Sequence, residues 1–380
     1  MLQTKLFKEF FESEKAGGII LIFCTIVSLV IANSSWGHQY HQFWQSSFAN
    51  HSLEHWVNDG LMTIFFLLIG LELEREVYIG ELSKIKDALF PTFGAIGGML
   101  IPAFIFLIFN YGTNTQSGAG IPMATDIAFA LGILSLLGNR VPLSLKVFLT
   151  ALAVIDDLGA ILVIAFFYTE TIIWINLIVS LNIFVGLLIL NRLKVRNLIP
   201  YIIGGIGMWY FMLHSGVHAT ITGVLLAFAI PFGNGDEKST SYLLQHFLHK
   251  PVAFLILPIF ALANTAIEIN GSIIETFKEN YAIGIILGLV IGKPLGIFSL
   301  TFIAHKLKIC KIPTDLNWFK ILAISCLGGI GFTMSIFITL LALNDNHVIN
   351  NAKLIILLSS VLAGIIGFIA LKKVLKTSST

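Results

Sequence analysis

Long apolar stretches, separated by short polar segments, dominate the chain. A helix needs about 20 mostly apolar residues to cross the hydrocarbon core of a bilayer, and stretches of this kind recur twelve times. The sequence therefore predicts an all-α polytopic membrane protein. The predicted spans cover residues 17–33, 60–78, 89–109, 119–138, 145–168, 172–190, 198–213, 216–232, 252–267, 281–304, 319–342 and 353–371.

The composition agrees with this prediction and disfavours other classes of protein. Charged residues make up only 12% of the 380 positions, and hydrophobic residues make up 56%. A soluble globular protein carries about twice that charged fraction. The net charge of +2 is too small, and the basic residues too scattered, to indicate nucleic-acid binding. The first segment, MLQTKLFKEFFESEKAGG, has no cleavage site of small residues, so we expect no removable signal peptide.

Positive charges alternate between the two sides of the predicted spans. Lysine and arginine concentrate in the cytoplasmic loops of membrane proteins. With the N-terminus inside, external loops hold only Lys278 and Lys353 of the 23 basic residues, while Lys293 lies within a span. The sequence therefore predicts that both termini are cytoplasmic. The loop from Ser34 to Asn58 has neither lysine nor arginine and is predicted to be external.

Four ionisable residues lie near the centres of predicted spans: Asp126, Asp156, Asp157 and Lys293. A central Asp or Lys costs roughly 2.5 to 3.5 kcal/mol, so these side chains are expected to face protein or a water-filled cavity. For one acid and one base, a salt bridge that merely fixes packing is a reasonable alternative. Here the acids outnumber the base, so at least one carboxylate is expected to bind a proton or a cation.

Small and helix-breaking residues interrupt two of the predicted spans. They are Gly120 and Pro122, with the polar Thr125, in the fourth span, and Gly328, Gly329, Gly331 and Thr333 in the eleventh. Backbone groups freed at membrane depth are tolerated only beside protein, a cavity or an ion, although small residues also serve close helix packing. Because the interruptions occupy corresponding positions of two three-span units, we expect inverted repeats with a transport site between them.

Several motifs resemble one transporter family. They are GIPMATDIAFALG, LKVFL, AVIDDLGAI, HSGVHATITG, IGKPLGI and GIGFTMSIF. These motifs are similar to those of the NhaA family of bacterial sodium/proton antiporters, for which inverted repeats are an established feature. The resemblance extends from about Gly60 to the end of the last span. It implies exchange of sodium, and of lithium, for protons across the bacterial inner (cytoplasmic) membrane.

The resemblance implies further properties of the protein. The transport is expected to be electrogenic and regulated by pH, to serve pH homeostasis, and to be carried out by a homodimer with no cofactor and no enzymatic activity. The implied organisation places two core repeats, residues 88–170 and 281–380, against an interface part formed by residues 1–87 and 171–280.

The resemblance also implies roles for the residues in the middle of the membrane. The residues implied to bind sodium and exchange protons are Asp156, Asp157, Asp126, Thr125 and Lys293. Among them, Thr125 and Asp126 are implied to lie where the two broken helices cross, and Lys293 to be the partner of the acids. Neighbouring helix positions lie about 100° apart, so we expect Asp157 to be the main sodium ligand and Asp156 to lean towards Lys293. The implied supports of the broken helices are Pro122, Gly329, Gly331 and Thr333.

Regulation by pH is predicted for the cytoplasmic end of the second span. The candidates there that match the family are Glu72, Arg75 and Glu76, and His218 matches another site of the family. A solvated helix end is the alternative interpretation. Glu74 stands where the family usually has a basic residue, and Gln245 where it usually has an acid. These two departures leave the pH at which transport begins open.

The predicted external loop is rich in histidine and tryptophan. Its histidines are His38, His41, His51 and His55. Its tryptophans are Trp36, Trp44 and Trp56. Metal binding is one interpretation, although the ligand spacing is weak. We prefer an amphipathic or hairpin element that places the tryptophans at the membrane interface and supports the dimer.

Three other classes of membrane protein were weighed. An intramembrane aspartyl protease needs two acids on separate helices, whereas Asp156 and Asp157 are adjacent. A channel needs weak, repeated sites rather than one deep carboxylate pair. The nearest alternative is a sodium-coupled solute symporter. The predicted sites of this sequence, however, lack the aromatic and amide groups that usually bind an organic substrate.

Overall fold

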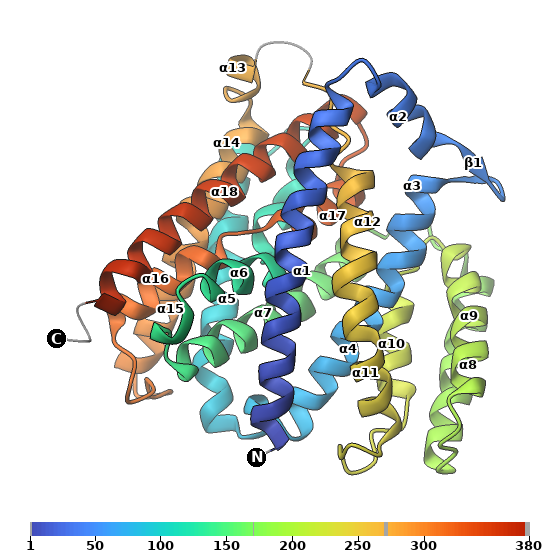
Figure 1. Ribbon diagram of the computed structural model, residues 1–380. Coiled ribbons are helices and arrows are strands. Elements are labelled where there is room, and N and C mark those ends of the chain that lie inside the picture. Colours follow the sequence, from blue (N-terminus) through green and yellow to red (C-terminus); the bar gives the residue numbers. More distant parts are fainter. Residues whose placement is uncertain (1, 170, 270–272, 377–380) are drawn as a thin grey trace.

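The computed structural model describes residues 2–169, 171–269 and 273–376, and these are almost entirely helical (Figure 1). The α-helices are α1 (Leu2–Ala32), α2 (Gly37–Gln45), α3 (Leu53–His55), α4 (Met62–Tyr78), α5 (Ile85–Asn110), α6 (Ile127–Ser135), α7 (Leu143–Phe167), α8 (Trp174–Arg192), α9 (Ile199–Leu213), α10 (Ile221–Ala229), α11 (Thr240–Pro251), α12 (Leu257–Asn264), α13 (Ile273–Thr276), α14 (Asn280–Leu287), α15 (Lys293–Lys306), α16 (Trp318–Gly328), α17 (Phe332–Ala342) and α18 (Asn346–Lys376). The 3-10 helices are η2 (Glu81–Ser83), η3 (Gln116–Met123) and η4 (Gly138–Arg140). In the described part of the chain, β-structure is confined to the antiparallel hairpin of β1 (Ser47–Phe48) and β2 (His51–Ser52).

Each of the twelve predicted spans coincides with a helix or with consecutive helices. In the described residues, eight helical segments are long and apolar enough to cross a membrane, or ten if each of two bent pairs is one span. The other two predicted spans correspond to the shorter helices α9 and α10. Helix α10 has only nine residues, because the chain forms turns from His214 to Thr220 before it begins. The prediction of a membrane-spanning, all-α fold is confirmed.

The two predicted repeats have the same order of elements. In the first, the long helix α5 is followed by the broken span η3–α6 and the long helix α7. In the second, α14–α15 is followed by the broken span α16–α17 and the long helix α18. In each unit the first long helix contacts the first half of the broken span, α5 with η3 and α15 with α16. This correspondence is what two related repeats require.

Helices α5 and α15 cross with their backbones in contact. A Cβ atom added at Gly97 would lie 2.0 Å from the carbonyl oxygen of Gly296, and one added at Gly296 would lie 2.1 Å from that of Gly97. No side chain fits on either side of this crossing. The two helices can approach to this distance only because both positions are glycine.

Three π-helical turns, which the sequence analysis did not predict, interrupt long helices. They are η1 (Trp56–Leu61), η5 (Val252–Ile256) and η6 (Gly288–Gly292). Single π-turns inside α-helices are uncommon and often lie at functional sites. The turn η6 ends directly before Lys293, the lysine predicted to lie within a span.

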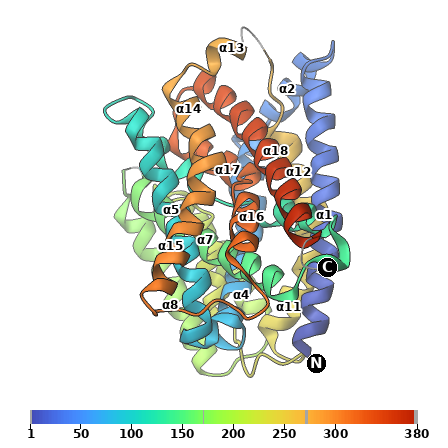
Figure 2. The same cartoon turned by 90° about the vertical axis from the view of Figure 1, so that its left-hand side faces the viewer.

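The helices form one bundle with a looser edge. Helices α8 and α9 pack on each other and on α10 at the edge of the bundle, as the right-hand side of Figure 1 shows. The short helix α2 and the β-hairpin lie at the upper end, so both forms of the element expected for the external loop are present. The first turn of α1 lies at the lower end of Figures 1 and 2, and the cytoplasmic placement of the termini remains a prediction.

Replacing Gly97 with alanine is expected to destabilise the protein. The new methyl group would force the backbones of α5 and α15 apart, and overpacking of this kind costs about 1–3 kcal/mol. The measurement is the midpoint of thermal unfolding in detergent. Gly186→Ala on α8 is the matched control, because a Cβ there meets nothing within 4 Å and should not lower the midpoint. Equal midpoints for the two variants would contradict the packing described above.

Candidate functional site

The two broken spans meet at their interruptions in the middle of the bundle. Helix α6 begins after Asp126, while α16 and α17 are separated by a short break and bent by 49°. The backbone N–H of Asp126 donates to the carbonyl of Ile330 at 2.6 Å, and the Thr125 hydroxyl donates to the carbonyl of Gly328 at 2.8 Å. These bonds join segments about two hundred residues apart. The expected crossing of the two broken helices is therefore present.

Asp126 caps the N-terminal ends of both second halves. One carboxylate oxygen accepts from the backbone N–H of Phe129 in α6 at 2.9 Å. The other accepts from the backbone N–H and the hydroxyl of Thr333 in α17, at 3.0 and 2.6 Å. Because helix N-termini carry partial positive charge, a carboxylate is well suited to this position. The side chain is 2% exposed, so these bonds replace the water that it lacks.

Lys293 interacts with the C-terminal end of the first half of a broken span. Its ammonium group donates to Asp156 at 2.5 Å and also to the carbonyl of Met123, the last residue of η3. A carbonyl at a helix C-terminus carries partial negative charge, which favours a cation. Lys293 is fully buried and Asp156 is 1% exposed. The predicted approach of Asp156 to Lys293 is thus present in the structure.

Asp157 lies beside this pair and forms no ion pair with another residue in the described part of the chain. It is 2% exposed, and it lies close enough to Asp156, Asp126 and Lys293 to interact electrostatically with all three. Within the described residues, the buried Oδ1 atoms of Asp156 and Asp157 have no hydrogen-bond partner. A buried carboxylate without such partners is costly unless it binds a proton or a cation. Thr125 lies close to Asp156.

The turn η6 packs on both interruptions. A Cβ at Gly288 would lie 2.6 Å from the Cβ of Pro122, and a Cβ at Gly329 would lie 2.3 Å from the carbonyl oxygen of Leu289. At Gly331 an added Cβ would lie 2.1 Å from the Ser335 hydroxyl oxygen. Gly288, Gly329 and Gly331 therefore lie where larger residues would not fit, and Pro122 packs against the first of them. The close backbone approach explains the small residues that the sequence concentrates there.

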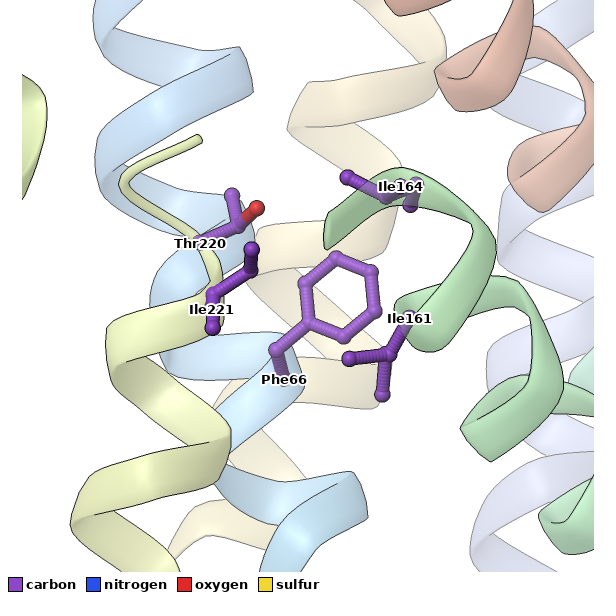
Figure 3. Close-up of a pocket in the computed structure, with 5 residues that line it drawn as sticks. All are labelled: Phe66, Ile161, Ile164, Thr220 and Ile221. Carbon is purple, nitrogen blue, oxygen red and sulfur yellow. The ribbon is translucent and has the colours of Figure 1, made fainter. Parts of the chain in front are cut away.

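An apolar pocket lies beyond Asp157 along α7. It is lined by Phe66 of α4, Ile161 and Ile164 of α7, and Thr220 and Ile221 at the start of α10. Figure 3 shows the Phe66 ring between the side chains of Ile161 and Ile221. Ile161 and Ile164 follow Asp157 by four and seven positions, so they lie on its side of the helix. Apolar side chains therefore border the aspartate in this direction.

The predicted pH-sensing residues on α4 face helix α11. The carboxylate of Glu72 lies 3.4 Å from Nε2 of His249, and the guanidinium of Arg75 lies 5.1 Å from the centre of the Tyr242 ring. Glu76 interacts electrostatically with Arg75. The sequence analysis did not select His249 or Tyr242. In the sequence, only the ionisable side chain of His249 in LLQHFLHKP could have indicated this contact with Glu72.

His218 lies at the other end of the α4 span. Its Nε2 is 2.8 Å from the carbonyl oxygen of Tyr168, and it interacts electrostatically with Asp59 in η1. The structure therefore does not bring His218 to Glu72. Glu74 stands where the family usually has a basic residue. It is 4% exposed, and its Oε2 has no hydrogen-bond partner in the described residues.

The external histidines do not form a metal centre. His51 and His55 stack with ring centroids 4.2 Å apart, and Nδ1 of His55 lies 3.1 Å from the carboxylate of Asp59. Across the described ranges, no three His, Cys, Asp or Glu side chains lie where they could hold a metal ion. The metal-binding interpretation of this loop therefore has no geometric support.

The chain is similar to known proteins over its whole length. The family model described as "Na+/H+ antiporter 1" matches residues 8–371. The Na(+)/H(+) antiporter NhaA of Flavobacterium psychrophilum is 73% identical over 375 residues, covering 99% of this chain and 98% of the relative. The proteins of that name from Cytophaga hutchinsonii and Dechloromonas aromatica are 63% and 59% identical. These matches cover 99% and 97% of this chain and 97% and 96% of the relatives.

Replacing Lys293 with methionine is expected to destabilise the fold strongly. Asp156 would remain buried without its cation, and breaking a buried ion pair from one side costs about 3–5 kcal/mol. Thermal unfolding in detergent should show a large fall for Lys293→Met. The double variant Lys293→Met with Asp156→Asn should recover most of that loss, because no unpaired charge remains. A double variant no more stable than Lys293→Met would contradict this account.

Proposed function

The chain belongs to the Na+/H+ antiporter 1 family, and on that premise we propose that Asp156 and Asp157 alternately bind sodium and protons. Membership gives the broader function: the protein is a membrane-embedded Na+/H+ antiporter and not an enzyme. The proposal concerns how this chain performs the exchange.

The observation that carries the proposal is the pair of adjacent, buried carboxylates with one lysine paired to Asp156. Lys293 neutralises Asp156 at 2.5 Å, while the Oδ1 atoms of Asp156 and Asp157 have no hydrogen-bond partner among the described residues. Sodium is a hard cation that prefers oxygen ligands. Protons and sodium ions therefore compete for the same oxygens, and occupancy by one excludes the other. Competition at one site becomes exchange when access alternates between the two sides of the membrane.

The surrounding residues hold the pair in place. Asp126 and Thr125 fix the crossing of the broken helices, and Thr333 binds Asp126. Pro122, Gly329 and Gly331 allow the interrupted segments to pack against η6. We assign Thr333, Pro122, Gly329 and Gly331 to positioning. We assign Asp126 and Thr125 to the ion site as well, because they lie close to Asp157 and Asp156.

Alternating access requires two parts that move against each other. We assign residues 88–170 and 281–380 to a core that carries the aspartates, and residues 1–87 and 171–280 to an interface part. The apolar pocket in Figure 3 lies between these parts, because Phe66 and Ile221 face Ile161 and Ile164 across it. The interface part would also form the homodimer, in a bacterial inner membrane with both termini in the cytoplasm.

The carboxylate pair also supports electrogenic transport. If more than one proton leaves for each sodium ion that binds, each cycle moves net charge, and the membrane potential then drives exchange. Lithium is a smaller hard cation and is expected to use the same oxygens. The protein would accordingly contribute to pH homeostasis by exporting sodium and taking up protons.

Sodium-driven proton movement in proteoliposomes tests the proposal. With an acidic lumen, external sodium or lithium should make the lumen more alkaline in wild type. Asp157→Asn should abolish this response, because it removes the carboxylate left without a cation. A potassium diffusion potential should change the wild-type rate if transport is electrogenic.

The control is Asp236→Asn, which removes an exposed acid from a loop and should transport normally. Asp157→Asn with wild-type transport would refute the assignment of the site. Transport that requires an organic solute would instead identify a symporter.

Replacing Glu72 with glutamine is expected to change the pH profile of transport. The carboxylate of Glu72 lies 3.4 Å from Nε2 of His249, and its charge at this contact between α4 and α11 is lost when it binds a proton. Glutamine has no proton to bind here, so sodium-driven exchange should depend less steeply on pH. The exposed Glu237→Gln variant should retain the wild-type pH profile. An unchanged profile for Glu72→Gln would remove this pair from regulation.

A further inference from the structure

Three side chains spaced seven residues apart form a row along α7: Thr150, Asp157 and Ile164. Seven residues turn an α-helix to within about 20° of two full turns, so these side chains share one face. Figure 3 shows Ile164 on the side of α7 that faces Phe66 of α4. Thr150 therefore lies on the same face as Asp157, about 10 Å nearer the beginning of α7.

The Thr150 hydroxyl is buried and has no hydrogen-bond partner. Its side chain is 8% exposed, and no group in the described residues bonds its Oγ1 atom. Threonines in other helices donate to the carbonyl four residues earlier, namely Thr25, Thr63, Thr92, Thr301 and Thr339. The same bond is open in principle to Thr150, because Lys146 belongs to the same helix. Its hydroxyl instead lacks the usual local acceptor.

An unpartnered buried hydroxyl costs about 1–3 kcal/mol, so a purely structural role would favour valine at this position. Thr222 also has an unpartnered buried hydroxyl in the described residues, but it belongs to α10 and not to this row. Thr150 is thus the position where such an oxygen shares a helix face with an unpartnered carboxylate oxygen. Because the two oxygens lie on one face of α7, they are placed to contact the same ligand one after the other.

We propose that Thr150 is a second contact for sodium, on the route between the beginning of α7 and Asp157. A distance of about 10 Å is too long for one ion to touch both side chains, so the contacts are successive. A neutral hydroxyl offers sodium a hard oxygen but holds it more weakly than a carboxylate does. In the other direction the row continues with Ile164, which offers no ligand. This assignment rests on the proposed function.

Replacing Thr150 with valine tests the contact, because valine keeps the shape and removes the oxygen. Losing one neutral ligand is expected to raise the apparent KM for sodium about three- to tenfold. The maximal rate at saturating sodium should stay within about twofold, and the pH profile should not change. Thr150→Ser should retain the wild-type KM, while Thr150→Ala should raise it as valine does. Thermal unfolding should show no loss of stability for Thr150→Val.

The matched control is Thr301→Val, which removes a buried hydroxyl that is bonded within its own helix. Its KM for sodium should equal that of wild type. An active Thr150→Val protein with wild-type KM would overturn the assignment and leave the proposed function intact. A changed pH profile with unchanged KM would also overturn it, because the hydroxyl would then serve the proton. Absence of sodium-driven exchange in wild type would overturn the proposed function and this inference together.

Discussion

The broken helices depend on one constraint: four helix ends lie away from water and each needs an opposite charge or a hydrogen bond. Asp126 supplies it for the N-terminal ends of α6 and α17. Lys293 and Thr125 supply it for the C-terminal ends, at the carbonyls of Met123 and Gly328. Because these groups are already engaged, Asp157 is the acid of this cluster that forms no ion pair within the described residues. The proposed ion site thus follows from the way the helix ends are satisfied.

Close backbone contact is the second requirement of this arrangement. Gly97 and Gly296 let α5 and α15 touch, and Gly288 and Gly329 let η6 lie against both interruptions. Glycine is unfavourable inside a helix, by about 1 kcal/mol relative to alanine. The chain accepts this cost where two backbones meet. The glycines thus determine how closely the lysine-bearing helix approaches the aspartates.

Much of this architecture could be predicted from the sequence, because a bilayer imposes strong demands on composition. Span positions follow from apolar length, and the pairing of Lys293 with a buried acid follows from the cost of isolated buried charges. The choice of Asp156 as that acid came from the family resemblance and the angle between neighbouring helix positions. Other features leave no comparable pattern. The π-turns depend on backbone hydrogen bonding rather than hydrophobic periodicity, and the partner of Glu72, His249, lies far away in sequence. The orphan hydroxyl of Thr150 depends on a rotamer, which a sequence does not specify.

The turn η6 has a consequence for how relatives of this chain are compared. A π-turn holds one residue more than the α-helical turn that it replaces, so everything after it is rotated by about 100°. The direction in which Lys293 points therefore depends on the number of residues from Asn280 to Gly292. It does not depend on the amino acids of the IGKPLGI motif alone. A homologue that lost one residue from this stretch could retain the motif and turn its lysine towards a different neighbour. Such a change would appear in an alignment as a single gap, although it would change which side chain the buried lysine pairs with.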